Sequence, residues 1–351
     1  MTDFMQRTLD SAAERAPAWL QDWLRDGRGR WQASEMPTRK TENWKYTNVH
    51  ALRQPFAPPE ASSMALADVA VRLPELGGYR MVFVNGHYRP ELSGNGLPGG
   101  VSLVRFADAD AGQAARIREH LGSAAGRDRA LFTALNDAAL ADGVFLEIDA
   151  GARVEEPLHI AWITGNQDSA FSVNQRLLVL CGEHSRARVI EHFASARGQQ
   201  ETFTNGITEL LLQCGAALEH YRLHLEESAA MHVGGVYAHL GESATLESFH
   251  LALGSSLKRV DVLVEHRGPG AHCELSGVYL PRGSEHVDYH TCVEHAVPEC
   301  TTDEVFRGIV ADEASAVFNG RIHIHPHAQK TRAQLSNKNL LTSASAEVNT
   351  K

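Results

Sequence analysis

The stretch CGAALEHYRLHLEESAAMHVGGVYAHLGESATLESFHLALGSSLKRVDVLVEHRGPGAHCELSGVYL (residues 214–280) decides the fold. Polar and apolar residues alternate in short runs, and turns containing Gly, Ser or Ala separate the runs, as in consecutive β-strands. Similar strand openings place Ala217, Ala244 and Ala271 at one identical spacing, twice in succession. A fixed step of this kind is typical of stacked coils that bury a shared core. The stretch therefore predicts a β-solenoid.

The same pattern continues on both sides of this stretch. From about residue 143 onward, short alternating segments such as VFLEID and AVFNGRIHIH follow one another without a helix-length segment between them. Their order argues against a sheet built from βαβ units. A sandwich, a barrel or a propeller is the alternative to the solenoid that the repeat favours. We predict a mainly β protein in which residues 143–351 form a parallel β-helix core.

Residues 1–142 differ in character and predict an N-terminal helical or mixed region. In residues 4–24, apolar side chains recur at steps of three and four, as in an amphipathic helix, which Pro17 should kink or split. The segment MVFVNGHYRPEL (81–92) predicts a β-hairpin with Asn85-Gly86 as its turn. Sixteen of the 19 histidines lie at or after His159, which also separates the two regions.

Composition restricts the classes of function. The chain has 351 residues, a net charge of −10, 43% hydrophobic residues and 22% charged residues, the balance of an ordinary globular protein. Its acidity argues against nucleic acid as a partner. No apolar run approaches the ~18–20 residues that span a bilayer. The N-terminal residues lack the basic start and apolar core of a secretory signal. We expect a cytoplasmic protein with no membrane partner.

The cysteines do not form a recognisable site. Their number is odd, they are widely spaced and no CxxC occurs, which argues against a disulfide scaffold, a zinc ribbon and a ferredoxin-type cluster site. We expect buried, reduced thiols in strands. The five are Cys181, Cys214, Cys273, Cys292 and Cys300.

Common catalytic motifs are missing from the sequence. GxxxxGK[ST], a GxGxxG between a strand and a helix, and GxSxG do not occur, so we expect no catalytic residues. The acid pairs Glu155-Glu156 and Glu226-Glu227 lie in turn-like contexts and are expected to be solvated. Because two carboxylates flanking a groove can cleave sugars, a β-helix polysaccharide hydrolase or lyase stays an alternative. The missing secretory signal counts against it.

The histidines suggest another alternative, a His-rich metal-binding protein. His323, His325 and His327 alternate, so a strand would project them from one face. A row of solvent-facing polar side chains is the interpretation that we favour, because Pro326 disturbs the strand and no obvious carboxylate completes a two-histidine set. The candidate metal ligands are His290, His323 and His325.

The segment RKTENWKYT (39–47) places two aromatic residues between charged ones. We expect it to cap the first coil, with the rings of Trp44 and Tyr46 buried. A partner surface is the alternative.

Several segments resemble the SufB/SufD family of iron–sulfur cluster assembly proteins, in order and over essentially the whole chain. The series from EVFRGIV to SNKNLL resembles the SufD branch rather than the SufB branch. The similar segments are ENWKYTNV (42–49), FVNGHY (83–88), LNDAALADGVFLEIDAG (135–151), NQRLLVLCGEHSRARVIEHF (174–193), FRGIVADEASAVFNG (306–320) and AQKTRAQLSNKNLLTSASAEVNTK (328–351).

The resemblance implies a fold and a role. The fold would be an N-terminal helical region, a central parallel β-helix and a C-terminal helical region. The role would be that of a non-catalytic scaffold subunit that joins SufB and the ATPase SufC and is tied to iron supply. An iron–sulfur cluster would be present only transiently in the complex, and no cofactor would be bound stably. SufB would meet this chain through the ends of the two β-helices, and SufC would dock on the C-terminal helical part.

The resemblance also covers less than the family's full pattern. The family continues with a strand, a Cys-Ser-His segment and a helical domain, and no position here matches them, so no cluster ligand is transferred. Because AEVNTK (346–351) lies in strand-like sequence without a cap, we expect a fragment whose last coils pair with SufB or with a second copy. Internal side chains that bond turn backbone are an equal alternative for the candidate contacts. These contacts are Asn319, Gln334, Asn337 and Asn339.

Overall fold

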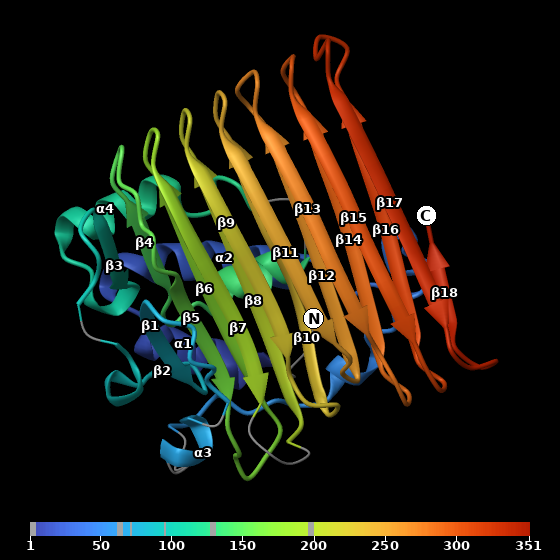
Figure 1. The fold of residues 1–351 in the computed structure, drawn as a ribbon. Helices are drawn as coiled ribbons and strands as arrows, with labels where there is room; N and C mark the ends of the chain where they lie inside the picture. Colours follow the sequence, from blue (N-terminus) through green and yellow to red (C-terminus); the bar gives the residue numbers. More distant parts are fainter. Residues whose placement is uncertain (1–4, 62–65, 71, 95, 127–130, 196–199) are drawn as a thin grey trace.

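Two β-sheets stacked face to face form the body of the molecule (Figure 1). The computed structural model describes residues 5–61, 66–70, 72–94, 96–126, 131–195 and 200–351. The sheets form a parallel β-solenoid of about seven turns, with a helical region at its N-terminal end. The prediction of a mainly β chain with a β-helix core and an N-terminal helical region is confirmed.

In the described part of the chain, sheet A and sheet B each contain nine strands, in the orders β18-β16-β14-β12-β10-β8-β6-β4-β3 and β17-β15-β13-β11-β9-β7-β5-β1-β2. Within the solenoid, successive strands alternate between the sheets and neighbouring strands run parallel. The strands are β1 (Tyr79–Val84), β2 (His87–Tyr88), β3 (Val101–Arg105), β4 (Val144–Ile148), β5 (Leu158–Thr164), β6 (Phe171–Cys181), β7 (Arg186–Ser195), β8 (Thr202–Leu212), β9 (Ala217–Leu225), β10 (Ala230–Leu240), β11 (Thr245–Leu253), β12 (Leu257–His266), β13 (His272–Leu280), β14 (His286–His295), β15 (Thr301–Val310), β16 (Ser315–Ile324), β17 (Arg332–Leu341) and β18 (Glu347–Thr350).

The helices pack mainly over the outer face of sheet A. An apolar core joins Leu20, Trp31 and Leu135 to outward-facing side chains of sheet A such as Phe203. None of the helices in the described ranges is long and apolar enough to cross a membrane. The helices are α1 (Gln6–Arg15), α2 (Gln21–Ala33), α3 (Leu66–Ala70), α4 (Ala111–His120) and α5 (Leu131–Ala138), with short 3-10 turns η2 (Ala18–Leu20), η3 (Glu42–Trp44), η4 (His50–Arg53), η5 (Pro90–Leu92) and η6 (Phe106–Asp108).

Two local predictions for the N-terminal region are confirmed. Pro17 separates α1 from the turn that leads into α2, because proline cannot continue the helical hydrogen bonds. β1 and β2 form an antiparallel hairpin with positive φ at both Asn85 and Gly86, the backbone that Asn-Gly favours. The hairpin is part of sheet B of the solenoid, since β1 also pairs in parallel with β5.

The coil length varies along the solenoid, and this corrects the predicted fixed step. Ala217 pairs with Thr245, which pairs with His272, so the first of these two steps is one residue longer than the second. The alanines that stack are therefore Ala216, Ala244 and Ala271, all fully buried, and not the equally spaced set with Ala217. The difference of one residue lies in the turns, whose lengths the alternating pattern does not record.

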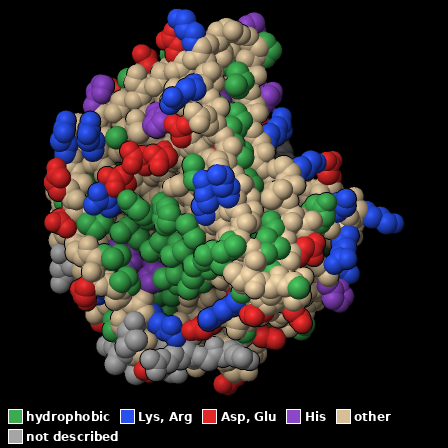
Figure 2. Space-filling view, turned by 45° about the vertical axis from the view of Figure 1, so that its right-hand side comes forward, with side chains coloured by type: hydrophobic (Ala, Val, Ile, Leu, Met, Phe, Trp, Pro, Cys, Tyr) green, Lys and Arg blue, Asp and Glu red, His purple; other side chains and the backbone are tan. Residues whose placement is uncertain are grey.

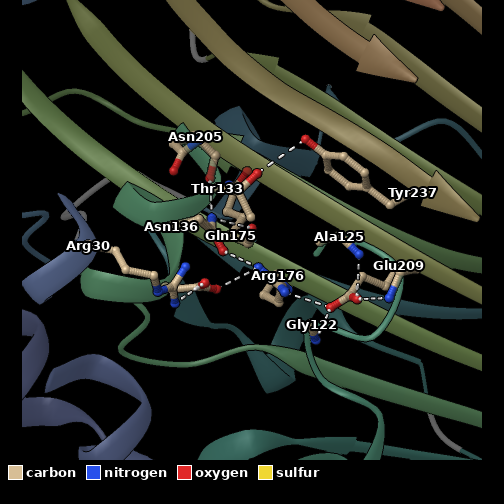
Figure 3. A network of polar contacts seen from close by, with 12 residues as sticks. Arg30, Gly122, Ala125, Thr133, Asn136, Gln175, Arg176, Asn205, Glu209 and Tyr237 are labelled. Atoms are coloured by element: carbon tan, nitrogen blue, oxygen red, sulfur yellow. Dashed lines mark hydrogen bonds and ion pairs between the residues drawn. The ribbon is translucent and has the colours of Figure 1, made fainter. Parts of the chain in front are cut away.

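A buried ion-pair network attaches the helical region to sheet A (Figure 3). The guanidinium of Arg176 on β6 donates to Asp137 on α5 at 3.1 Å and to Glu209 on β8 at 2.6 Å. Glu209 also accepts backbone N–H bonds, from Gly122 at 2.7 Å and from Ala125 at 3.0 Å. One arginine thus joins a helix, a loop and two strands.

Candidate functional site

Two histidines and a glutamate meet on the outer face of sheet A. Glu294 on β14 lies opposite His323 on β16 in the strand register. Oε2 of Glu294 is 2.7 Å from Nδ1 of His323 and 2.8 Å from Nε2 of His325. The two imidazole rings lie 4.4 Å apart, and the potential ligand atoms of the three residues all lie within 4.8 Å of one another.

This cluster includes only two of the three predicted ligands. His290 lies elsewhere on β14, where its Nε2 is 3.1 Å from Asp288. His327 is exposed beyond the end of β16. Glu294 is the carboxylate that the sequence analysis did not find, so the expectation that none completes the set is wrong. Only the stacking of coils brings it to the histidines, from 29 and 31 residues away.

The electrostatics of the cluster favour a charged carboxylate. Partial burial alone would raise the pKa of Glu294, but hydrogen bonds from His325 and His323 outweigh it and hold this pKa below its usual value. The thiol of Cys292 adds a weak contact, with Sγ 3.6 Å from Oε1 of Glu294.

The last two coils carry the predicted interface residues. Asn337 donates to the hydroxyl of Tyr279 at 3.0 Å, and that hydroxyl donates to Asn339. The side chains of Asn337 and Asn339 point inward, because each residue pairs with a buried residue of β15. Gln334, in contrast, is exposed. Asn319 lies opposite His290 and lines a small hollow beside the 42–47 segment.

Apolar side chains are exposed over the same coils. Figure 2, turned to bring the C-terminal end forward, shows a broad hydrophobic patch. Inward-facing residues of β16 and β17 contribute Ile324, Leu335 and Leu341, with exposed fractions of 47%, 38% and 45%. Each corresponds to a buried position in the preceding coil of its own sheet. Among the described residues, no strand pairs with the outer edges of β17 and β18.

Polar residues fill much of the solenoid interior, against the usual pattern of strands. On β9 the side chains of His220, Arg222 and His224 are buried, while Tyr221 and Leu223 are partly exposed. The hydrophobic alternation of this strand therefore predicts the wrong inner face.

Two buried carboxylates pair with buried cationic side chains of the interior. Arg222 lies 2.7 Å from Glu191, and Lys258 lies 3.1 Å from Glu226. Burial would raise the pKa of Glu191, but Arg222 and His220 outweigh it and lower this pKa to about 2. The expectation that Glu226 is solvated is wrong, because it lies inside the solenoid and bonds His232 at 2.7 Å.

The RKTENWKYT segment lies against late coils rather than over the first one. Arg259 on β12 donates to the carbonyl of Asn43 at 2.5 Å and stacks 4.0 Å from the ring of Trp44. Thr47 donates to Asp288 on β14. Tyr46 is 47% exposed, so the expected cap with two buried rings is wrong.

The five cysteines, all within the described residues, are thiols rather than disulfides. Cys181, Cys273 and Cys300 are buried, whereas Cys214 and Cys292 are partly exposed. Burial raises the pKa of Cys181 to about 12 and also raises the pKa values of Cys273 and Cys300.

A hollow on the outer face of sheet B bears on the polysaccharide alternative. It measures about 280 Å³ and is lined by both arginines and acids. Two hydrogen bonds from Arg188, at 2.7 and 3.1 Å, engage Glu219 at this hollow. The geometry therefore does not favour the free pair of acids that sugar cleavage needs.

Comparison with known proteins gives consistent matches over the chain. The family model "SUF system FeS cluster assembly, SufBD core domain" matches residues 162–351, and "SufBD protein N-terminal region" matches residues 1–160. The iron-sulfur cluster assembly protein SufD of Escherichia coli is 29% identical, with 96% of this chain and 75% of the relative covered. The SufBD family protein slr0076 of Synechocystis is 26% identical, with coverages of 90% and 72%. Protein ABCI7, chloroplastic, of Arabidopsis thaliana is 24% identical, with coverages of 90% and 67%.

Proposed function

Since the chain belongs to the SufBD family of the SUF system for iron–sulfur cluster assembly, we propose that it is a non-catalytic scaffold subunit that pairs with SufB and the ATPase SufC. A role in iron–sulfur cluster assembly follows from the family itself. The pairing, the scaffold work and a contribution to iron supply are the finer parts of the proposal. The complex would assemble in the cytoplasm, with the cluster as its cargo.

Exposed apolar side chains on the last described coils are the observation that supports the pairing. Ile324, Leu335 and Leu341 expose apolar area on β16 and β17. An exposed apolar surface of this kind is what a partner subunit would cover. Because Leu335 and Leu341 are already more than half buried, covering the rest of each side chain would contribute about 1 kcal/mol.

The state of the thiols favours a subunit that assists cluster assembly and does not itself supply the cluster ligands. Clusters bind thiolates, and burial keeps Cys181, Cys273 and Cys300 protonated at neutral pH. SufB would therefore supply most cluster ligands. ATP hydrolysis by SufC would move the junction between the two solenoids and expose those ligands.

Replacing both Leu335 and Leu341 with Glu is expected to reduce the SufB recovered with the tagged full-length protein by about tenfold or more, because two charges would replace apolar area at the junction. The measurement is co-expression with cognate SufB and SufC, followed by purification through one tag. Leu253→Glu is the matched control, since Leu253 is 39% exposed on β11, several strands away from β17. Equal recovery with the double variant, or failure of SufB to co-elute with the parent protein, would contradict the proposal. Self-pairing without SufB would favour a homodimer instead.

A further inference from the structure

We propose that Glu294, His323 and His325 bind one divalent first-row transition metal ion on the outer face of sheet A. The site goes beyond the scaffold role and does not depend on it, because it is argued only from the geometry of these three residues. Two imidazole nitrogens and one carboxylate oxygen converge there from adjacent strands.

The backbone holds the three ligands in place before any ion binds. Glu294 and His323 are opposite one another in a continuous parallel ladder between β14 and β16. His325 follows β16 directly, yet its N–H donates to the carbonyl of His295 at 3.0 Å and its carbonyl accepts from Ala328 at 2.9 Å. Such fixed supports lower the entropy lost when the ligands are ordered by a metal.

The distances match a small metal ion after a minor adjustment. With metal–ligand bonds of about 2.0–2.2 Å, ligand atoms around one ion lie roughly 3.0–3.5 Å apart. The present N···O distances are 2.7 and 2.8 Å, so each pair needs to separate by only a few tenths of an ångström. The side chains of His323 and His325 are both 41% exposed, which leaves room for that rotation and for solvent ligands.

His323 and His325 can each free the nitrogen that faces Glu294 for a metal ion while their imidazoles stay neutral. A neutral histidine carries one N–H and can place it on either ring nitrogen. Moving that proton to Nε2 of His323 and to Nδ1 of His325 leaves lone pairs on the two nitrogens that face Glu294. The carboxylate oxygen that accepted the two hydrogen bonds then becomes the third ligand.

The donor set selects the class of ion. Two imidazoles and one carboxylate with open positions suit Fe²⁺ or Zn²⁺. Mg²⁺ and Ca²⁺ prefer oxygen ligands alone and should bind poorly.

Two other clusters of potential ligands are less suitable. His224, Glu226 and His232 are buried beside the Lys258 ammonium, so a divalent ion would add charge to an already neutralised carboxylate. His266, His295 and Cys300 are buried as well, and both histidines direct Nε2 at the hydroxyl of Thr302 at 3.1 Å. Of the three such clusters among the described residues, the Glu294 cluster is the partly exposed one.

The test is titration of the metal-free, full-length protein with Co²⁺ and Zn²⁺, followed by Co²⁺ absorption and by calorimetry. We expect one equivalent to bind, with no displacement by excess Mg²⁺. The affinity should fall at least hundredfold in the variant His323→Ala/His325→Ala and at least tenfold in Glu294→Gln. His327→Ala is the matched control and should bind as the parent does, because His327 is exposed outside the cluster.

Other results would overturn the site. These are unchanged affinity in the double variant, binding only at millimolar metal, or equal competition by Mg²⁺. Circular dichroism and urea unfolding show whether each variant is folded. A Zn²⁺-soaked crystal of the parent protein gives a readout without variants, since anomalous density should lie between the three side chains, and density at a different place would also overturn the site.

Discussion

Lowering the pH from 7.5 to 5.5 is expected to reduce the free energy of unfolding by several kcal/mol, a large part of the stability of an ordinary domain. The reason is a set of buried histidines that stay neutral in the folded chain. Burial lowers the pKa of His159 to about 3, of His192 to about 4 and of His266 to about 3. Burial also holds the pKa values of His224 and His250 well below the ordinary value.

The direction of the effect follows from proton binding. Below the unfolded pKa of about 6.5, the unfolded chain takes up protons that the folded chain refuses, so stability is lost as the pH falls. His159, His192 and His266 together contribute about 4 kcal/mol over this interval, and His224 and His250 add to the loss in the same direction. Glu304 opposes them, because burial raises its pKa to about 7 and the folded chain binds its proton first. Its gain of about 2 kcal/mol offsets part of the loss from the histidines.

Urea unfolding at both pH values measures this loss, and a double variant tests its source. His159 and His192 stack with their rings 5.6 Å apart, so His159→Phe/His192→Phe keeps the shape and removes two titrating groups. The loss should then shrink by about 3 kcal/mol. His327→Ala should leave it unchanged, because His327 is exposed. The same pH dependence in parent and double variant would show that these histidines are not its cause.

Replacing Arg176 with Met is expected to lower the free energy of unfolding by about 3–5 kcal/mol. The guanidinium is fully buried and pairs with Asp137 and Glu209, which are also buried. Methionine keeps most of the volume but leaves two carboxylates without their shared cation (Figure 3). Detachment of α5 and of the 122–125 loop from sheet A should follow, which hydrogen exchange of those segments would detect.

Arg188→Met is the control for this substitution. Arg188 pairs with Glu219 at 2.7 Å, but their side chains are 40% and 38% exposed. Solvent screens such a pair, so the loss should stay below about 1 kcal/mol in urea unfolding. Equal losses for the two arginines would mean that the buried network does not attach the helical region.

The sequence predicted the solenoid because its strands alternate and its turns recur, and both features are local. The sequence did not predict the register between coils, because the number of residues per coil changes with the length of the turns. For this reason Ala217 does not stack with Ala244 and Ala271. The inner face of β9 was also unpredictable from hydropathy. His220, Arg222 and His224 point inward only because Glu191 and neighbouring groups on adjacent coils compensate for them.

The sequence predicted the two histidines of the candidate site but not its glutamate, again because it does not determine the register between coils. The alternation of His323 and His325 places both on one face, and the structure agrees. Glu294 lies on the preceding coil of the same sheet, and a partner across coils depends on the register that the sequence leaves open. The RKTENWKYT segment was misplaced because its contacts with Arg259 and Asp288 join residues that are 216 and 241 positions apart in the chain.

Hydrogen exchange of the full-length protein with and without cognate SufB tests the central claim most directly. If the last described coils form the junction, the backbone amides of β17 (Arg332–Leu341) and β18 (Glu347–Thr350) should exchange more slowly in the complex. The β1–β2 hairpin at the opposite end should exchange at the same rate in both states. SufB binding that leaves β17 and β18 unchanged, or that protects the hairpin end instead, would contradict the account.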